Sequence, residues 1–287
     1  MQQQNKGIML VVLATFLFAS QDAMTKQLGS SVPLSVFIFF RYVAFCVFAY
    51  WFATRNKTLS EALQVKSVPL HITRGLLLVV EVFLFAYILK SIGLGEIHTI
   101  MVTFPLIITA LSPWILGEKV GWRRWIAVCV GFVGTVIIIS PGSVAFSQYS
   151  LMALVCAVMF AFYNLFTSKA AKTDSTESML LYTGLVGLAV SFPLVLINWQ
   201  SVPSEMVGWI LALCFCSVFS HLCNIQALKW TPAVTLQPFN YLVLPWAIFI
   251  GYVMFAERIP AHQYVGAALI GVSGLYVAYR QRLKTMS

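Results

Sequence analysis

The chain has 287 residues, of which 60% are hydrophobic and only 9% are charged. Soluble domains carry about a quarter charged residues, so this composition excludes an ordinary soluble fold and leaves room for many spans of about 20 residues. The formal net charge is +9, but the basic residues stand between apolar runs. That placement is typical of topology signals in a membrane protein and argues against a nucleic-acid-binding surface.

Taken in chain order, the apolar segments predict an all-α integral membrane protein with ten transmembrane helices. Most connections between them are short and rich in turn residues, and the longest, residues 54–68, is polar and basic. The predicted helices cover residues 7–26, 33–53, 69–89, 95–116, 122–140, 148–168, 178–197, 205–228, 233–255 and 262–280.

One sequence pattern occurs twice along the chain. Lys90 is matched by Lys229 and Glu118 by Glu257, with the same separation in both pairs. An internal repeat in a polytopic membrane protein is typical of a secondary transporter. Because five helices per half is an odd number, the second half enters the membrane from the opposite side. The chain is therefore expected to form two inverted five-helix repeats, residues 1–142 and 143–287.

Basic residues set the expected orientation. With the N-terminus inside, the outer segments hold only Lys26, Lys90 and Arg258, and the remaining lysines and arginines outside the helices fall in cytoplasmic segments. This bias predicts that both termini face the cytoplasm. The expected location is a bacterial-type inner (plasma) membrane.

Charged residues inside the first-half helices are the strongest candidates for function. Asp22 and Arg41 lie at comparable depth on the first two helices. A charge at the bilayer centre costs about 2.5–3.5 kcal/mol on insertion scales, so an Asp22–Arg41 ion pair is expected. Such a pair could face a substrate or merely hold the two helices together.

Glu81 lies near the middle of the third helix, between apolar stretches. With no neighbouring charge in sequence, its carboxyl is expected to bind and release a proton. The alternative is a neutral glutamic acid that is hydrogen-bonded to a backbone carbonyl.

The second half contributes polar rather than charged candidates. Asn164 falls where Asp22 falls in the first half, and the ninth helix begins with polar residues ahead of Pro245. Prolines inside membrane helices free backbone carbonyls, often beside a cavity. His98 and His221 could bind substrate or carry protons, or could be hydrogen-bonded structural histidines. The candidate substrate-binding or coupling residues are Asp22, Arg41, Glu81, His98, Tyr163, Asn164, His221, Asn224, Gln237, Asn240 and Tyr241.

Two further features are expected to be structural. The carboxylates of Glu118 and Glu257 are predicted to fix turns, each near a helix N-terminus. Small residues on the fifth and tenth helices allow close helix contact, either within the monomer or across a homodimer. These residues are Gly131, Gly134, Gly266, Gly271 and Gly274.

Motifs for catalysis and energy coupling are missing from the sequence. It has no phosphate-binding loop, no H-E-x-x-H and no G-x-S-x-G, and its six cysteines lack metal-site spacing. We therefore expect no enzyme, no cofactor and no metal. The expected partners are a small-molecule substrate, the lipid bilayer and, as a candidate coupling ion, protons, without nucleic acid. The rival classes are an integral-membrane enzyme and a channel.

The motifs also carry a family resemblance. The chain resembles the drug/metabolite transporter superfamily, EamA type, through Gly117-Glu118-Lys119, Gly131-Phe132-Val133-Gly134, Thr231-Pro232-Ala233 and Glu257-Arg258. This resemblance implies a central cavity between the two halves, with the fifth and tenth helices at the periphery. Asp22 to Lys26, Phe39-Phe40-Arg41 and His71 to Gly75 look closest to a subgroup that takes up S-adenosylmethionine.

The repeat and the resemblance together lead to one functional expectation. The chain is expected to be a secondary active transporter of a small polar or amphipathic metabolite, such as an amino acid or a derivative like S-adenosylmethionine, that works by alternating access. A broad-specificity metabolite or drug exporter is the alternative.

Overall fold

The computed structural model describes residues 2–55, 58–139, 147–269, 271–272 and 276, and these residues contain helices and no strands. The helices are α1 (Gln2–Gly29), α2 (Leu34–Thr54), α3 (Leu59–Leu63), α4 (Val68–Ile88), α5 (Leu94–Met101), α6 (Phe104–Leu116), α7 (Trp122–Ile139), α8 (Gln148–Ala170), α9 (Thr176–Ile197), α10 (Ser204–Trp230), α11 (Ala233–Asn240) and α12 (Val243–Phe255). Residues 261–269 form a further helical segment.

Eight helices of the described part of the chain are long and apolar enough to cross a membrane, when α5 with α6 and α11 with α12 each count as one. They fall at eight of the ten predicted positions, which confirms the all-helical membrane class. The fifth predicted helix corresponds to α7. The tenth begins as predicted at residues 261–269, but much of its remaining range, like the predicted cytoplasmic tail with Arg280, lies outside the described residues.

The fourth and ninth predicted helices are each broken in the middle. The break between α5 and α6 falls at Val102 and Thr103, directly before Phe104-Pro105, and the break between α11 and α12 falls at Tyr241 and Leu242, before Pro245. Proline has no N–H to donate, so Pro105 and Pro245 leave the carbonyls of Met101 and Tyr241 without the helical partner four residues on. The two predicted spans therefore hold as Leu94–Leu116 and Ala233–Phe255, each interrupted by a two-residue turn. The short α3 was not predicted either, and Thr58 and Glu61 cap its start reciprocally.

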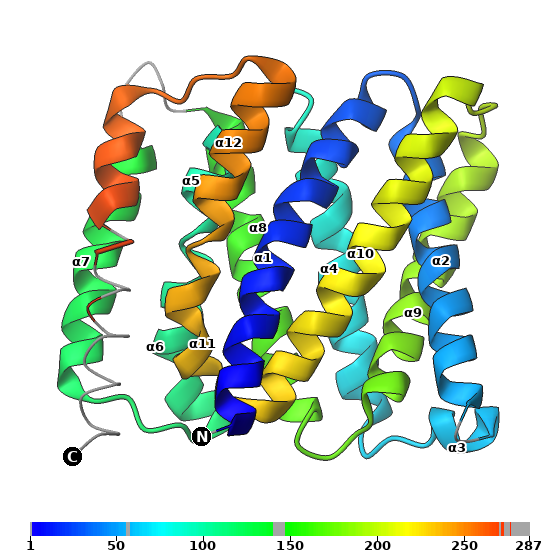
Figure 1. Ribbon diagram of the computed structural model, residues 1–287, viewed down its shortest axis with the longest axis horizontal. Coiled ribbons are helices and arrows are strands. Elements are labelled where there is room, and N and C mark those ends of the chain that lie inside the picture. Colours follow the sequence, from blue (N-terminus) through cyan, green and yellow to red (C-terminus); the bar gives the residue numbers. More distant parts are fainter. Residues whose placement is uncertain (1, 56–57, 140–146, 270, 273–275, 277–287) are drawn as a thin grey trace.

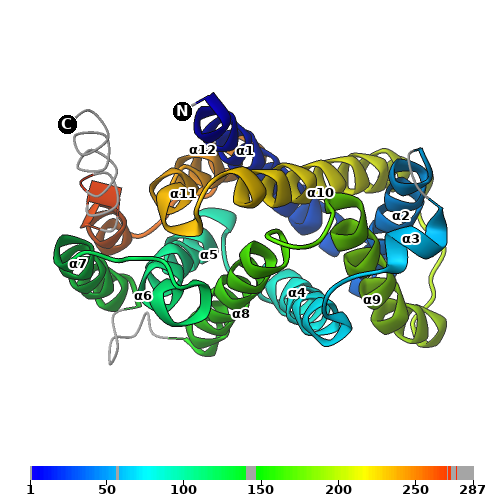
Figure 2. The same cartoon turned by 90° about the horizontal axis from the view of Figure 1, so that it is seen from below.

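The long helices run side by side across the molecule, and several are tilted against their neighbours, as α2 is against α1 and α10 (Figure 1). Seen along their axes they form two rows, with α12, α1, α10 and α2 in one row and α6, α8, α4 and α9 in the other (Figure 2). The rows join at both ends, where α2 packs on α9, α12 packs on α5 and α11 packs on α6. Between the joined ends, α1 and α10 face α4 and α8, and this interior holds the candidate site.

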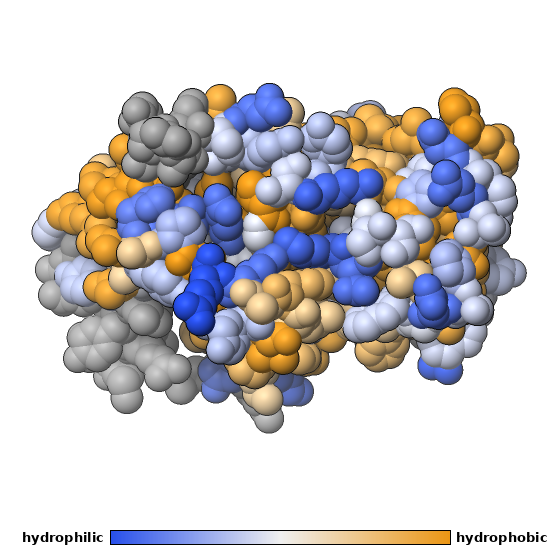
Figure 3. All heavy atoms as spheres, turned by 90° about the horizontal axis from the view of Figure 1, so that it is seen from above, coloured by the Kyte–Doolittle hydropathy of each residue, from blue (hydrophilic) through white to orange (hydrophobic). Residues whose placement is uncertain are grey.

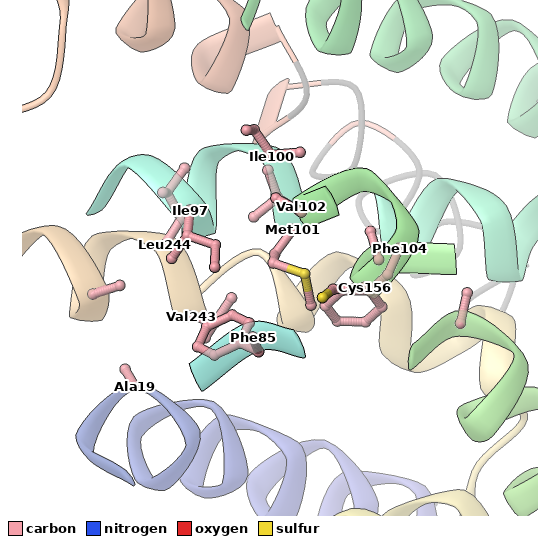
Figure 4. Close-up of a cluster of buried hydrophobic side chains, with 14 of the residues drawn as sticks. Ala19, Phe85, Ile97, Ile100, Met101, Val102, Phe104, Cys156, Val243 and Leu244 are labelled. Carbon is pink, nitrogen blue, oxygen red and sulfur yellow. The ribbon is translucent and has the colours of Figure 1, made fainter. Parts of the chain in front are cut away.

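Two apolar clusters hold the ends of the two rows together. One cluster surrounds the α5–α6 break, where Met101 and Phe104 lie beside Cys156 of α8 (Figure 4). The other cluster joins α2 to α9 and includes the fully buried Phe37, Tyr42 and Phe45. Many large apolar side chains remain exposed on the outside, as expected for a surface that faces lipid.

Small residues allow the peripheral helices to pack closely. A Cβ on Gly131 of α7 would overlap Leu106 of α6, and one on Gly266 would overlap Ile138 and the Gly134 carbonyl of α7. These glycines therefore form a seam within the monomer. Nothing lies within contact distance of a Cβ on Gly271, and Gly274 lies outside the described residues.

The two acids at matching positions of the repeat cap helices in a reciprocal way. Glu118, at the end of α6, accepts hydrogen bonds from the backbone N–H groups of Ala233 (3.0 Å) and Val234 (3.1 Å) at the start of α11. Glu257, after α12, accepts one from the N–H of Leu94 (2.6 Å) at the start of α5. A carboxylate is favourable at a helix N-terminus because of the unpaired N–H groups and the helix dipole. The predicted position near a helix N-terminus is confirmed, but the capped helix belongs to the other half of the chain and not to the turn that holds the acid.

Candidate substrate cavity

A buried cavity lies between the two rows of helices, near the breaks in α5–α6 and α11–α12. The space open to the centres of water molecules is about 60 Å³, which is enough for a few waters. Its wall combines polar and aromatic side chains from both halves of the chain. The lining residues include Thr15, Phe18, Gln21, Asp22, Thr25, Arg41, Glu81, Phe85, His98, Phe104, Phe160, His221, Asn224 and Asn240.

Asp22 is held in place from α1 and α5. One carboxylate oxygen, Oδ2, lies 3.1 Å from Nε2 of His98, and the other, Oδ1, accepts a hydrogen bond of 3.3 Å from the amide of Gln21. Nδ1 of His98 has no hydrogen-bond partner in the described structure. The buried Asp22 carboxylate is thus partnered without Arg41, so the expected Asp22–Arg41 ion pair was wrong. His98 is the partner of Asp22 because α5 lies beside the C-terminal part of α1.

Arg41 extends from α2 into the cavity wall, where its guanidinium contacts His221, and His221 in turn contacts Tyr163. Its Nη2 lies 3.4 Å from Nε2 of His221, and Nδ1 of His221 lies 3.0 Å from the hydroxyl of Tyr163. Phe18 and Phe45 pack edge-on against the His221 ring, with centroids at 5.1 and 5.5 Å. The Arg41 Nε has no hydrogen-bond partner in the described structure. Arg41 is therefore a buried cation with donor capacity to spare.

Glu81 lines the same cavity from α4 and is only 6% exposed. Its carboxyl forms no hydrogen bond with any described residue, although its backbone carbonyl lies 4.0 Å from the sulfur of Cys156. The alternative of a carboxyl hydrogen-bonded to a backbone carbonyl is therefore not what the structure contains. An unpartnered acid at this depth is placed to bind a proton or a cationic group.

The polar residues of the second half form a layer beside the cavity. Asn224 donates a hydrogen bond of 3.0 Å to Oδ1 of Asn164, and Asn240 donates one of 3.0 Å to Oε1 of Gln237. Asn224 and Asn240 line the cavity directly, whereas Asn164 and Gln237 support them from behind. Tyr241 packs against the apolar cluster at the α11–α12 break and does not line the cavity.

The structure therefore brings most of the predicted polar residues together. The cavity-lining members are Asp22, Arg41, Glu81, His98, His221, Asn224 and Asn240. Thr15, Gln21 and Thr25 also line the cavity and were missed. Their spacing from Phe18 and Asp22 on one face of α1 was the signal that could have found them.

An ion pair lies at the end of the molecule opposite the N-terminus. Lys26, one helical turn beyond Asp22, pairs with Glu257 and also donates a hydrogen bond of 3.0 Å to the carbonyl of Ile92. Beside this pair lies a depression of about 400 Å³ that is also lined by Lys90, Glu96 and Arg258. Figure 3 shows hydrophilic residues gathered over the middle of this end, with apolar residues toward its margins.

The fold and the cavity define a polytopic membrane protein with a polar site at the centre of its helix bundle. Residues 5–140 and 148–279 match the model of the EamA-like transporter family. The chain therefore belongs to that family, and it is a multi-pass membrane protein.

Relatives with known roles cover nearly the whole chain. It is 26% identical over 281 residues to an S-adenosylmethionine uptake transporter of Rickettsia prowazekii (strain Madrid E), covering 98% of this chain and 95% of the relative. It is 28% identical to a riboflavin transporter of Vibrio cholerae, covering 78% and 76%. It is 23% identical to a pseudopaline exporter of Pseudomonas aeruginosa, covering 93% and 94%. A solved protein structure matches with a TM-score of 0.72 at 18% identity, covering 96% of this chain and 97% of the other, which bears on the fold alone.

Proposed function

We propose that the chain is a secondary active transporter that carries a small zwitterionic metabolite through the central cavity by alternating access. The observation that carries this proposal is the set of opposed charges in the cavity wall. Asp22 and Glu81 supply two carboxyls and Arg41 supplies one guanidinium. Carboxylate and ammonium groups of an amino acid would find complementary partners there.

The charge balance of the cavity favours a ligand with a net positive charge. With both carboxyls ionised, the acids outnumber Arg41 by one charge. S-adenosylmethionine carries a carboxylate, an ammonium and a sulfonium group, and so has one excess positive charge. Its adenine ring could lie against Phe18, Phe85 or Phe160. A neutral ligand such as riboflavin would leave the acids unpaired, so we favour an amino-acid derivative of the S-adenosylmethionine type.

Alternating access would arise from two inverted five-helix repeats, residues 1–142 and 143–287. The reciprocal caps support this arrangement, because Glu118 caps α11 and Glu257 caps α5 from equivalent positions. Both termini are proposed to face the cytoplasm of a bacterial inner membrane, as the basic residues indicate. The cavity is too small here for a whole metabolite, so loading requires the rows to move apart.

The proposed direction of transport comes from the roles of the relatives. Uptake is the primary proposal because the S-adenosylmethionine relative that covers 98% of the chain is an uptake transporter. Export is a second candidate because the pseudopaline relative, which covers 93% of the chain, is an exporter. Flux into and out of proteoliposomes of known sidedness separates the two.

Protons are the proposed coupling ion, with Glu81 as their binding group. The carboxyl would alternate between a proton and the positive charge of the ligand. Glu81→Gln mimics the protonated form. It is expected to insert and fold with normal yield but to lose the response of S-adenosylmethionine flux to an imposed pH gradient.

The matched control for this experiment is Glu205→Gln, which changes an exposed acid at the start of α10. It should leave the gradient response unchanged. If Glu81→Gln responds to the pH gradient as wild type does, Glu81 is not the coupling group.

A further inference from the structure

A second buried arginine lies outside the cavity and makes no direct ion pair, although the Asp174 carboxylate acts on its charge across His71. Arg74 of α4 is 0% exposed. Its guanidinium donates to the Thr167 hydroxyl (3.2 Å) and to the Met179 carbonyl (2.9 Å), and it lies 3.4 Å from Nδ1 of His71. No ion pair joins it to a carboxylate of the described residues, and its Nη2 has no hydrogen-bond partner there.

Such an arrangement calls for an explanation, because a buried cation is costly unless it is paired. The nearest acid of this group, Asp174, binds His71 instead (Nε2 to Oδ2, 2.9 Å) and also accepts a hydrogen bond from the backbone N–H of Lys66. Uncharged hydrogen-bond donors would be enough to hold α4, α8 and α9 together. The permanent charge and the open Nη2 point to an anion that is absent from this conformation.

The position of Arg74 continues the lining of the cavity toward the N-terminal end of the molecule. On α4, Leu78, Glu81 and Phe85 line the cavity, and Arg74 lies one turn before Leu78 on the same face. At 1.5 Å per residue, Arg74 is about 10 Å from Glu81 along the helix axis. On α8, Thr167 lies two turns beyond the cavity-lining Phe160 in the same direction.

Tyr163 separates Arg74 from the cavity. The Arg74 guanidinium lies 5.4 Å from the centre of the Tyr163 ring, and the hydroxyl of Tyr163 holds His221 at the cavity wall. Phe160 stacks on the same ring, with centroids at 5.8 Å. A movement of the Tyr163 ring would therefore connect the cavity to Arg74.

We propose that Arg74 is a second binding position for the carboxylate of the transported metabolite, used on the cytoplasmic side of the cavity after Tyr163 moves aside. The proposal rests on the proposed transport function. Arg41 would bind the carboxylate in the central cavity, and Arg74 would bind it next on the way to the cytoplasm. A guanidinium suits this role because it binds a carboxylate through two parallel hydrogen bonds.

The test needs no substrate, so its failure differs from failure of the transport proposal. Thr167→Cys places a thiol beside Arg74. Thr73→Cys places one at the exposed neighbour on α4, in a pocket that also holds Lys66, Lys169 and Asp174, and it reports the charge preference of the surface. Each full-length variant in membrane vesicles is treated, from either side, with a negatively charged sulfonatoethyl or a positively charged trimethylammonium-ethyl methanethiosulfonate reagent. The unmodified chain gives the background of its six native cysteines.

We expect the Thr167→Cys thiol to react from the cytoplasmic side. The anionic reagent should react faster than the cationic one, and the charge of Arg74 should account for roughly tenfold of that preference. Adding Arg74→Gln should remove this preference, and adding Arg74→Lys should retain it. If Arg74→Gln does not fold, the reaction rates of the two reagents with Thr167→Cys alone still show whether an anion reaches Arg74 from the cytoplasm. No reaction from the cytoplasmic side, or reaction without preference for the anion, would overturn the proposal and leave Arg74 as a structural cation.

Discussion

The two acids of the cavity differ in what binds them. Asp22 is fixed by His98 and Gln21, whereas the Glu81 carboxyl has no hydrogen-bond partner in the described structure. A fixed carboxylate can orient a ligand without changing its own state, and an unpartnered one is free to exchange a proton for a positive charge. The proposed division of roles between Asp22 and Glu81 follows from this difference.

The contact between Asp22 and His98 predicts energetic coupling. Asp22→Asn and His98→Gln should each lower the unfolding midpoint in detergent, and the double variant should depart from additivity by about 0.5–3 kcal/mol, as residues in contact do. A double-mutant cycle followed by thermal unfolding measures this.

The control cycle combines Asp22→Asn with Arg41→Gln, which do not contact each other. It should lie closer to additivity. Equal coupling in both cycles would contradict the partner assignment derived from the structure.

Sequence alone predicted which helices carry the polar residues but not how those residues pair. Asp22 and Arg41 have comparable depth, yet Asp22 meets α5 and Arg41 meets α10. Depth follows from position along a helix, whereas a partner depends on which helix packs alongside. Arg74 was noticed only as part of a family motif, because its contacts with Thr167 and Met179 come from helices distant in sequence.

At the scale of helices, the fourth and ninth predicted spans are present, but each is interrupted by a two-residue turn that was not predicted. Prolines marked both places, but proline in a membrane helix can produce either a bend or a full break. Here each break ends a short first segment, α5 or α11, whose N-terminus is capped by an acid of the other half. These caps depend on which helices pack together, so the local sequence of α5 or α11 does not predict them.

The reciprocal caps make a prediction about stability. Glu118→Ala and Glu257→Ala each remove the acceptor for buried N–H groups, so each should destabilise the protein by about 1–2 kcal/mol. Glu205→Ala, at an exposed acid, should change the unfolding midpoint little. Midpoints for Glu118→Ala and Glu257→Ala that match the one for Glu205→Ala would argue against a stabilising role for the caps.

Close packing of α2 on α9 makes a second prediction at this scale. A Cβ on Gly187 would overlap the ring of the fully buried Tyr42. Gly187→Ala should therefore destabilise the protein by about 1–3 kcal/mol, as overpacking does.

The matched control is Gly208→Ala on α10, where nothing lies within 4 Å of the added Cβ. Alanine is favoured over glycine within a helix by roughly 0.5–1 kcal/mol, so this variant should be neutral or slightly more stable. Equal loss of stability in both variants, measured by thermal unfolding, would contradict the close packing at Gly187.

At the scale of the whole molecule, we infer that different chemistry separates the cavity from the two ends. The Lys26–Glu257 ion pair closes one end, and the layer of Tyr163, Arg74 and Thr167 closes the other. A carrier needs two such barriers that open in turn. The side chains at each barrier come from both halves of the chain, which fits the proposed movement of one half against the other.

The most direct test of this account is counterflow in proteoliposomes. Vesicles containing the purified protein are loaded with unlabelled S-adenosylmethionine, an amino acid or riboflavin, and the labelled compound is added outside. For the transported compound, the account predicts transient accumulation of label above its equilibrium level, and loss of this overshoot in Arg41→Gln. A rise that stops at equilibrium for every compound, or an overshoot that Arg41→Gln leaves unchanged, would contradict transport by alternating access through the central cavity.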